Sequence, residues 1–241
     1  MPTFIHGRST TVYIAGYDAS ANLRSTTYQG MNEPADVTTY GQSDKAFIPG
    51  LSATQISHEG VYSSGTAEAE TWLGALTGGT AEPWTVYVGG DTFGNAGYAH
   101  PVVQTAYAIT DEVADAVKFT VEGTGTGVAI DRVVSIRALA TATGTAAGTN
   151  HDNTVGTNNG CAAYLHVISG TCSAGTVIVE HSTDGATGWA TLATFTFAGT
   201  AAVGGIGAQY AEASGTVRRY VRHNVTDLAG TVRFAVGFAR H

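Results

Sequence analysis

The chain has 241 residues, of which 43% are hydrophobic and only 12% are charged, and its formal net charge is −8 at pH 7. This length accommodates two domains with sizeable cores, and the low charge content with 32 glycines favours short strands and turns over long helices. The acidic balance argues against a nucleic-acid-binding protein, which needs a basic face to neutralise phosphates. We therefore expect an all-β protein.

Neither a secretion signal nor a membrane span is predicted. The N-terminal MPTFIHGRST lacks the charged start and apolar stretch of a signal peptide, and no segment approaches the ~20 apolar residues of a membrane helix. Two cysteines are too few for a disulfide scaffold, and buried free thiols are favoured over a disulfide for Cys161 and Cys172. We expect a soluble chain made in a cytoplasm, without a membrane partner.

Strand signals dominate the first part of the chain. In TTVYIAG (Thr10 to Gly16), Val12 and Ile14 lie on one face, and further strand signals follow in ATQISHEGVY, WTVYVGG and VKFTVEG. These segments alternate apolar and polar residues and are separated by turn formers. They predict a β unit.

One segment of this unit has helical spacing instead. Thr66 can cap the helix, and Gly78-Gly79 can end it. The apolar positions recur at the i, i+3, i+4, i+7 spacing of one helix face. We expect this face to pack on the sheet through Ala69, Trp72, Leu73 and Leu76.

A boundary between two units is predicted at residues 141–150. This run, TATGTAAGTN, has small residues without periodicity and resembles a linker. Residues 1–149 hold 14 acidic and 6 basic side chains, whereas residues 150–241 hold 5 of each. The predicted organisation is a first domain over residues 1–140, a linker over 141–150 and a second domain over 151–241.

The second unit is strand-rich throughout. TVIVEH (Thr176 to His181) leads into a turn at Asp184-Gly185 and then into ATLATFTF, and the C-terminal segment alternates apolar residues from Val232 to Phe238. About six to eight strands fit this length, which suits a β-sandwich of the immunoglobulin or jelly-roll type.

The motif search predicts no enzyme, no catalytic residue, no cofactor and no metal site. No G-x-S-x-G elbow, P-loop or H-E-x-x-H is present. His151 and Asp152 form an isolated pair without further metal ligands nearby in sequence. Asp111, Glu112 and Asp115 are expected in a solvated turn rather than in acid-base chemistry, and the glycine-rich residues 122–128 are expected to join two strands rather than to cradle a phosphate.

The order of several weak motifs resembles a known family. HGRSTTVYIAGYDASANL is followed by DVTTYGQSDKAFIPGL, by ISHEGVYSSG and the expected helix, and then by WTVYVGG and DAVKFTVEGTGTGVAIDRVV. Over about residues 5 to 139, this order resembles that of the major tail (tail tube) proteins of long-tailed bacteriophages, the siphophages. The resemblance implies a tail-tube-type β-sandwich or barrel domain with a flanking helix, followed here by the second β-sandwich domain.

The resemblance also implies a function and partners. Copies of such a chain close into rings, hexameric in that family, which stack into a hollow tail tube that conducts DNA during ejection. The implied partners are other copies of this chain, the tape measure protein and transiting DNA in the lumen without sequence-specific binding, and the tail terminator and tail tip proteins. The implied location is the virion, with assembly in the bacterial host cytoplasm.

A loop is the expected site of self-assembly. Residues 32–49 are long for a connection between two strands, and in the family a Thr-Thr-x-Gly turn and a Pro-Gly-Leu exit bracket such a loop. An acidic first unit would suit a lumen that repels DNA. The expected self-assembly residues are Asp36, Thr38, Thr39, Gly41, Asp44, Lys45, Pro49 and Gly50.

The second domain is expected to decorate the exterior of the tube. Trp189 follows a hairpin turn and is either a core residue or a platform for a surface carbohydrate. Two other function classes stay open: another virion component, such as a capsid decoration protein or a tail terminator, and a carbohydrate-binding β-sandwich protein.

Overall fold

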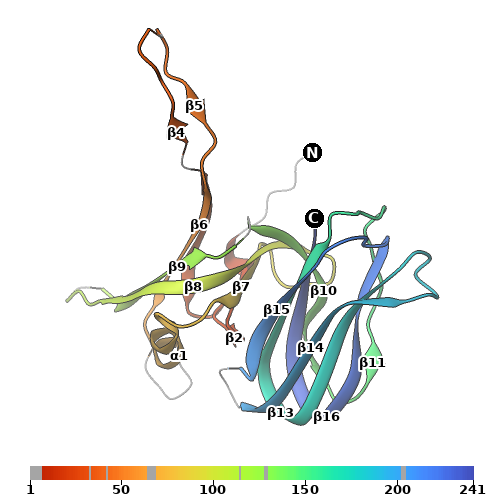
Figure 1. The fold of residues 1–241 in the computed structure, drawn as a ribbon. Helices are drawn as coiled ribbons and strands as arrows, with labels where there is room; N and C mark the ends of the chain where they lie inside the picture. Colours follow the sequence, from red (N-terminus) through yellow and green to blue (C-terminus); the bar gives the residue numbers. More distant parts are fainter. Residues whose placement is uncertain are drawn as a thin grey trace.

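Almost all regular structure in the computed structural model is β-strand (Figure 1). The structure describes residues 7–32, 34–41, 43–63, 69–113, 115–127, 130–201 and 205–241. Within them, one short α-helix and one 3-10 turn accompany the strands, which confirms the predicted fold class. The elements are η1 (Gly7–Ser9), β1 (Thr11–Ile14), β2 (Tyr17–Asp18), β3 (Leu23–Asn32), β4 (Ala35–Asp36), β5 (Phe47–Ile48), β6 (Ser52–Val61), α1 (Ala69–Leu76), β7 (Glu82–Tyr87), β8 (Ala96–Thr110), β9 (Lys118–Gly125), β10 (Asp131–Ala142), β11 (Ala146–Ala147), β12 (His151–Asp152), β13 (Cys161–Ser182), β14 (Ala190–Ala201), β15 (Gly207–Ala213) and β16 (Tyr220–Arg240).

The N-terminal unit is organised around β8, which belongs to two sheets. Its first half pairs with β7 and β10, and its second half pairs with β9. The first sheet continues as β10-β8-β7-β1-β2, whereas the second runs β8-β9-β6-β3. The core between the sheets is closed by α1 and contains Val12, Ile14, Ala15, Ala19, Ile56, Trp72, Leu73, Trp84, Val86, Val102, Phe119 and Val121.

The helix α1 presents its apolar side to this core. Leu73 is fully buried, Trp72 is 7% exposed and Leu76 is partly buried against the same cluster. The Trp72 ring stacks on Tyr17, with ring centroids 4.2 Å apart. The expected N-cap, Thr66, and the side chain of Ala69 lie outside the described residues. The helix ends where the amide of Gly79 donates to the carbonyl of Leu76 at 3.1 Å, after Gly78 has adopted a φ of 74°.

The C-terminal unit is built from two long strands, β13 and β16, that pair along their whole length. The first half of β13 also pairs with β15, and its second half pairs with β14. Each long strand thus passes from one sheet into the other, near two register shifts in their pairing. The two backbones lie close together there: a Cβ at Gly170 would lie 2.3 Å from the Thr231 carbonyl oxygen, and a Cβ at Gly230 would lie 2.1 Å from that of Thr171. Strands that switch sheets in this way close a β-sandwich.

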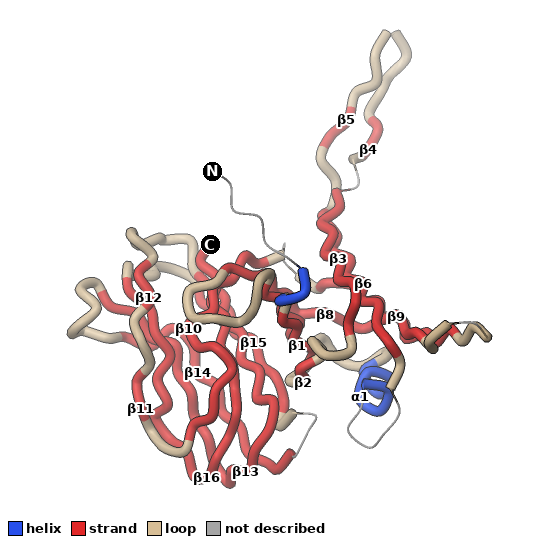
Figure 2. Tube along the Cα trace, turned by 180° about the vertical axis from the view of Figure 1, so that it is seen from behind, coloured by secondary structure: helices blue, strands red, loops and turns tan. Residues whose placement is uncertain are grey.

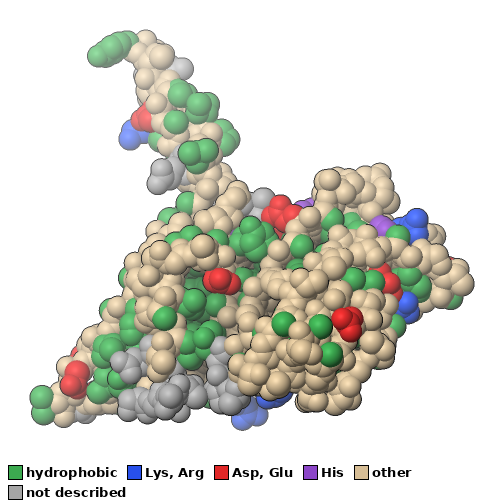
Figure 3. All heavy atoms as spheres, turned by 60° about the horizontal axis from the view of Figure 1, so that its bottom comes forward, with side chains coloured by type: hydrophobic (Ala, Val, Ile, Leu, Met, Phe, Trp, Pro, Cys, Tyr) green, Lys and Arg blue, Asp and Glu red, His purple; other side chains and the backbone are tan. Residues whose placement is uncertain are grey.

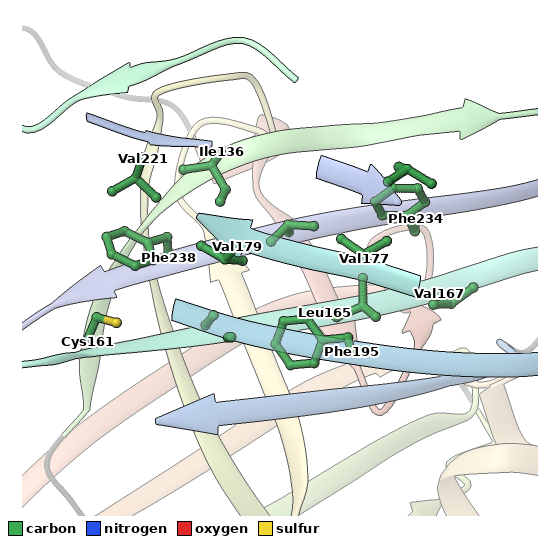
Figure 4. Packing of buried hydrophobic residues seen from close by; sticks show 14 of the residues in the cluster. Ile136, Cys161, Leu165, Val167, Val177, Val179, Phe195, Val221, Phe234 and Phe238 are labelled. Carbon is green, nitrogen blue, oxygen red and sulfur yellow. The ribbon is translucent and has the colours of Figure 1, made fainter. Parts of the chain in front are cut away.

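The core of this sandwich is aliphatic and aromatic (Figure 4). It includes Val177, Val179, Phe195, Phe234 and Phe238, with Phe197 partly buried against it. Cys161 and Cys172 are both buried in it as free thiols. Burial raises the pKa of the Cys161 thiol to about 11, so this thiol is neutral at physiological pH.

The segment from 141 to 150 differs from the expected linker. Its first two residues end β10, and Ala146 and Ala147 form β11, which pairs with β16. The backbone from Val133 to Asp152 therefore follows β16 along the edge of the sandwich (Figure 2). Pairing of this kind uses backbone groups, so a run of small residues carries no side-chain signal for it.

The strand β10 also joins the two units. Residues Asp131 to Val134 pair with β8, and residues Val133 to Ala142 pair with β16. The boundary expected at residue 140 thus falls within a strand whose Ile136 is buried in the C-terminal core. A third buried cluster lies between the units and contains Tyr13, Tyr87, Ala99, Val133, Ala162, Tyr164, Ile168, Ala235 and Ala239.

Candidate self-association site

A long hairpin projects from the N-terminal unit (Figures 1 and 2). Its stem is the antiparallel pair β3 and β6, paired from Leu23 opposite Gly60 to Asn32 opposite Ser52 with one register shift between Leu23 and Ser25. The two-residue strands β4 and β5 continue it, and the connection between them forms the tip. We call residues 32–51 the arm. The expected assembly loop is the distal half of this hairpin rather than a loop lying on the body.

Side-chain hydrogen bonds order the tip of the arm. Oδ1 of Asp36 accepts bonds from the backbone amide and the hydroxyl of Thr38, at 2.9 and 2.5 Å. The Thr38 hydroxyl oxygen accepts the amide of Ala46 at 3.0 Å, and the amide of Val37 donates to the Ala46 carbonyl at 2.8 Å. These bonds to Thr38 lower the pKa of the Asp36 carboxyl. Thr38 thus bridges the two sides of the hairpin.

The tip turns at Gly41, whose φ is 99°, a value that side-chain-bearing residues rarely adopt. All eight residues expected for self-assembly lie on the arm, and all are exposed. The hairpin brings Asp36 and Thr38 together with the Ala46 backbone, whereas Pro49 and Gly50 lie on the returning strand toward the stem. Asp36 and Thr38 thus have a local role in shaping the hairpin.

The apolar side chains of the arm were missed by the sequence analysis. Twelve large hydrophobic residues of the described chain are exposed, and five of them lie on this short segment. Tyr40 and Leu51 are the most exposed of the five, at 109% and 87%. The five are Val37, Tyr40, Phe47, Ile48 and Leu51; the view in Figure 3 shows hydrophobic side chains along the arm. The sequence signal for them is the stretch AFIPGL, in which apolar residues recur among turn formers.

An arm of this composition is suited to contact another macromolecule. A two-stranded hairpin is at best marginally stable in water by itself, and exposed apolar patches mark interaction sites. Burying one such side chain contributes about 1.5 to 3 kcal/mol. Five of them on one projecting element therefore favour burial of the arm against another surface.

A second surface has a different character. One face of the sheet β3-β6-β9 points away from the core, and most of its exposed or half-buried side chains are polar. We call it the polar face; it contains Thr27, Gln29, Gln55, Ser57, Glu59, Thr120, Glu122 and Thr124. Glu59 and Glu122 are its two carboxylates, and Lys118, which continues the same alternation on β9 near Glu59, adds a cation. Two carboxylates against one cation leave this surface with a net negative charge, which disfavours binding of a polyanion.

The residues considered for metal binding or acid-base chemistry lie apart from one another. Asp152 is held by Arg219 through bonds of 2.7 and 2.6 Å, which lower the pKa of its carboxyl to about 2. Asp115 pairs with Lys118 at 2.6 Å on an exposed turn, beside the exposed Asp111 and Glu112. Among the described residues, no three His, Cys, Asp or Glu side chains gather to hold a metal ion, and no described helix is long and apolar enough to span a membrane.

The residue considered for carbohydrate stacking is partly covered. The guanidinium of Arg222 lies over the Trp189 ring, 3.9 Å from its centroid, and the indole nitrogen donates to the Ala186 carbonyl at 3.3 Å. Trp189 is half-buried. One face of the ring is therefore already occupied by the protein itself.

Comparison with known proteins gives weak likenesses to solved structures. No protein-family model and no curated protein matches the chain. The virion of a native gene transfer agent particle aligns at 17% identity over 53% of this chain and 97% of the other, with a TM-score of 0.39. The tail of an empty gene transfer agent particle, refined with C6 symmetry, aligns at 16% over 46% and 81%, with a TM-score of 0.36.

A third solved structure aligns with nearly the whole chain. It is the SPP1 Dit protein, described as a paradigm of the hub adsorption apparatus in phages that infect Gram-positive bacteria, at 12% identity over 96% of this chain and 99% of the other, with a TM-score of 0.39. The similar structures are thus virion, tail and hub proteins. At these identities and TM-scores, the likenesses do not carry a function to this chain.

Proposed function

We propose that this chain is a structural protein of a phage-type tail, whose copies associate into rings that stack into a hollow tube. The observation that supports the proposal most directly is the arm, which projects from the body and exposes five large apolar side chains. The order of sequence motifs described above supports the same function independently. We place the protein in the virion, after assembly in the host cytoplasm.

Association through a projecting arm is head-to-tail. The surface that receives the arm differs from the arm itself, so each copy offers one of each. Heterologous contacts of this kind close into rings or continue as filaments. The gross stabilisation from burying the arm is offset by the freedom that the subunits lose on association. Removing two of the large side chains should therefore prevent assembly.

In the tube we propose, the polar face lines the channel and the C-terminal unit lies outside. The polar face carries Glu59 and Glu122 against one cation, Lys118, which is paired with Asp115, so transiting DNA would slide past without being retained. The tape measure protein would occupy the same channel before ejection. Terminator and tip proteins would bind the two ends of the tube.

The experiment compares the wild-type chain with an arm variant and a matched control by negative-stain electron microscopy. The arm variant carries Tyr40→Ser and Phe47→Ser. The control carries Ile109→Ser and Val113→Ser, which remove exposed apolar side chains from the β8–β9 hairpin (48% and 111% exposed). We expect wild type and control to form tubes on the order of 100 Å wide, the size of a ring of six small domains, and the arm variant to stay monomeric.

Two results would contradict the proposal. Tubes formed by the arm variant would show that the arm does not hold the assembly. Wild-type protein that forms only discrete trimers would favour a capsid decoration protein instead. Circular dichroism of both variants checks that the body is folded.

A further inference from the structure

A groove opens at the base of the arm. Its volume is about 990 Å³, and it lies between the stem strand β3 and the sheet strands β1, β7 and β8. Its apolar lining includes Val12, Val86, Val88 and Tyr98, and Arg8 and Arg24 add positive charge. Val88 and Tyr98 are 41% and 42% exposed. These are large apolar side chains facing water within a concave surface.

The tip of the arm cannot enter the groove of its own chain. The groove is lined by residues Leu23 to Tyr28 at one end of the hairpin, and the tip lies at its other end. The ladder of β3 and β6, continued by β4 and β5, holds the two apart. An arm that occupies the groove must therefore come from a different molecule.

We propose that the groove receives the arm of a second copy of this chain. This inference rests on the proposed self-association and names the surface that accepts the arm. The arm offers Tyr40, Phe47 and its other exposed apolar side chains to the apolar lining of the groove.

The charges of the arm and the groove, and the open backbone edge of β3, both favour this contact. The described residues of the arm carry Asp36 and Asp44 against a single cation, Lys45, and the groove presents Arg8 and Arg24. In addition, β3 pairs only with β6 in the described sheet, so one of its backbone edges is open along the groove. An open edge accepts a strand from another chain. The arm, being a hairpin, brings strands of its own.

The contact has a defined geometry. Because donor tip and acceptor groove lie at opposite ends of one hairpin, each contact displaces the next copy by about the length from Tyr28 to Tyr40. At a rise of roughly 3.3 Å per residue, this length is on the order of 40 Å. Repetition of one heterologous contact then gives an assembly whose subunits repeat at about that spacing.

The test mixes two chains that are each defective in one half of the contact. The arm variant is Tyr40→Ser with Phe47→Ser, and the groove variant is Val88→Asp with Tyr98→Asp. A control carries Ile109→Asp with Val113→Asp on the β8–β9 hairpin. All six side chains are exposed, so the fold should tolerate the changes, which thermal melts verify. Mass is measured by light scattering after size exclusion.

We expect wild type and control to assemble, and each of the two variants to be monomeric at concentrations at least tenfold above the wild-type threshold. An equimolar mixture should give dimers and nothing larger. In that mixture the intact arm of the groove variant enters the intact groove of the arm variant, and no further contact is available.

Other outcomes overturn the inference in distinguishable ways. A groove variant that assembles like wild type shows that the arm binds elsewhere, while self-association itself still holds. If the groove variant assembles like wild type but melts at a lower temperature, another part of the chain fills the groove. A mixture of folded variants that stays monomeric shows that arm and groove do not engage each other. A wild-type chain that never assembles removes the proposed function as well.

Discussion

The hydroxyl of Thr85 lies 2.9 Å from Nε2 of His166, and both side chains are buried. Thr85 belongs to β7 of the N-terminal unit, and His166 belongs to β13 of the C-terminal unit. The His166 ring also packs against Tyr13, with ring centroids 5.4 Å apart. Next to this contact, Asp91 accepts bonds from Tyr13 and Ser135, at 2.7 and 2.6 Å. The units are therefore joined by a buried interface in addition to the shared strand β10.

This contact predicts loss of stability in mild acid. Burial lowers the pKa of His166 from 6.5 to about 3, so between these pH values the unfolded chain binds a proton that the folded chain does not. The contribution of neutral His166 to the free energy of unfolding is fully present above pH 6.5 and is lost as the pH drops toward 3. At about 1.4 kcal/mol per pH unit, acidification to pH 5 should cost about 2 kcal/mol. His58, also with a pKa lowered to about 3 by burial, adds a similar loss.

Urea unfolding at pH 7.5 and pH 5 measures this dependence. The variant His166→Gln keeps a polar group near the Thr85 hydroxyl and does not titrate, so its stability should fall less between the two pH values than that of wild type. Equal pH dependence in both chains would mean that His166 is not the titrating group.

A second prediction is that the two units unfold together. They share β10 and the buried cluster around Tyr13 and Tyr164, so exposing one unit exposes apolar surface of the other. Differential scanning calorimetry should show a single transition with equal calorimetric and van't Hoff enthalpies. Two separated transitions would show that the interface contributes little to the stability of either unit.

Gly16 provides a point test of the same interface. Its φ is 86°, and a Cβ there would lie 2.6 Å from the carbonyl oxygen of Gly207 in the C-terminal unit. Gly78 has a similar φ of 74° with nothing within 4 Å, so Gly78→Ala measures the backbone cost alone, about 1 to 2 kcal/mol. We expect Gly16→Ala to cost clearly more in urea unfolding. Equal costs would mean that the units separate readily at this contact.

The packing of helix α1 predicts a large loss of stability when the Trp72 side chain is truncated. Trp72 is 7% exposed and stacks on Tyr17, so Trp72→Ala should destabilise the chain by about 3 to 5 kcal/mol. The half-buried Trp189 is the matched control, and Trp189→Ala should cost less. Similar melting temperatures for wild type and the Trp72 variant would undo this packing argument.

The polar face predicts a change in DNA retention after charge reversal. Glu59→Lys with Glu122→Lys places cations on the proposed channel wall, where released counterions would favour phosphate binding. A control with Glu212→Lys and Asp227→Lys makes the same change on the C-terminal unit. Tubes of the first variant should retain nuclease-resistant DNA at low salt, whereas DNA bound to the control should be digested. The reverse pattern would place the polar face outside.

The strands and the helix could be predicted because their side chains alternate or repeat with the period of the element. The alternate spacing of Val177 and Val179 predicts a buried strand face, and the helical spacing of Trp72 and Leu73 predicts a buried helix face. The pairing of Ala146 with Val225 could not be predicted, because a run of small residues reports nothing about a partner so distant in the chain. The turn residues of the arm indicated an exposed segment. Its apolar residues, such as Phe47, were overlooked because loops are expected to be polar.

The shared strand β10 also determines how the chain bears force. A force applied to the C-terminal unit is transmitted to the N-terminal unit through the hydrogen-bonded ladder from β16 to β10 to β8. Many interstrand bonds are then loaded together along the strand direction, and they resist sliding collectively. The chain should behave as a stiff element whose compliant part is the arm.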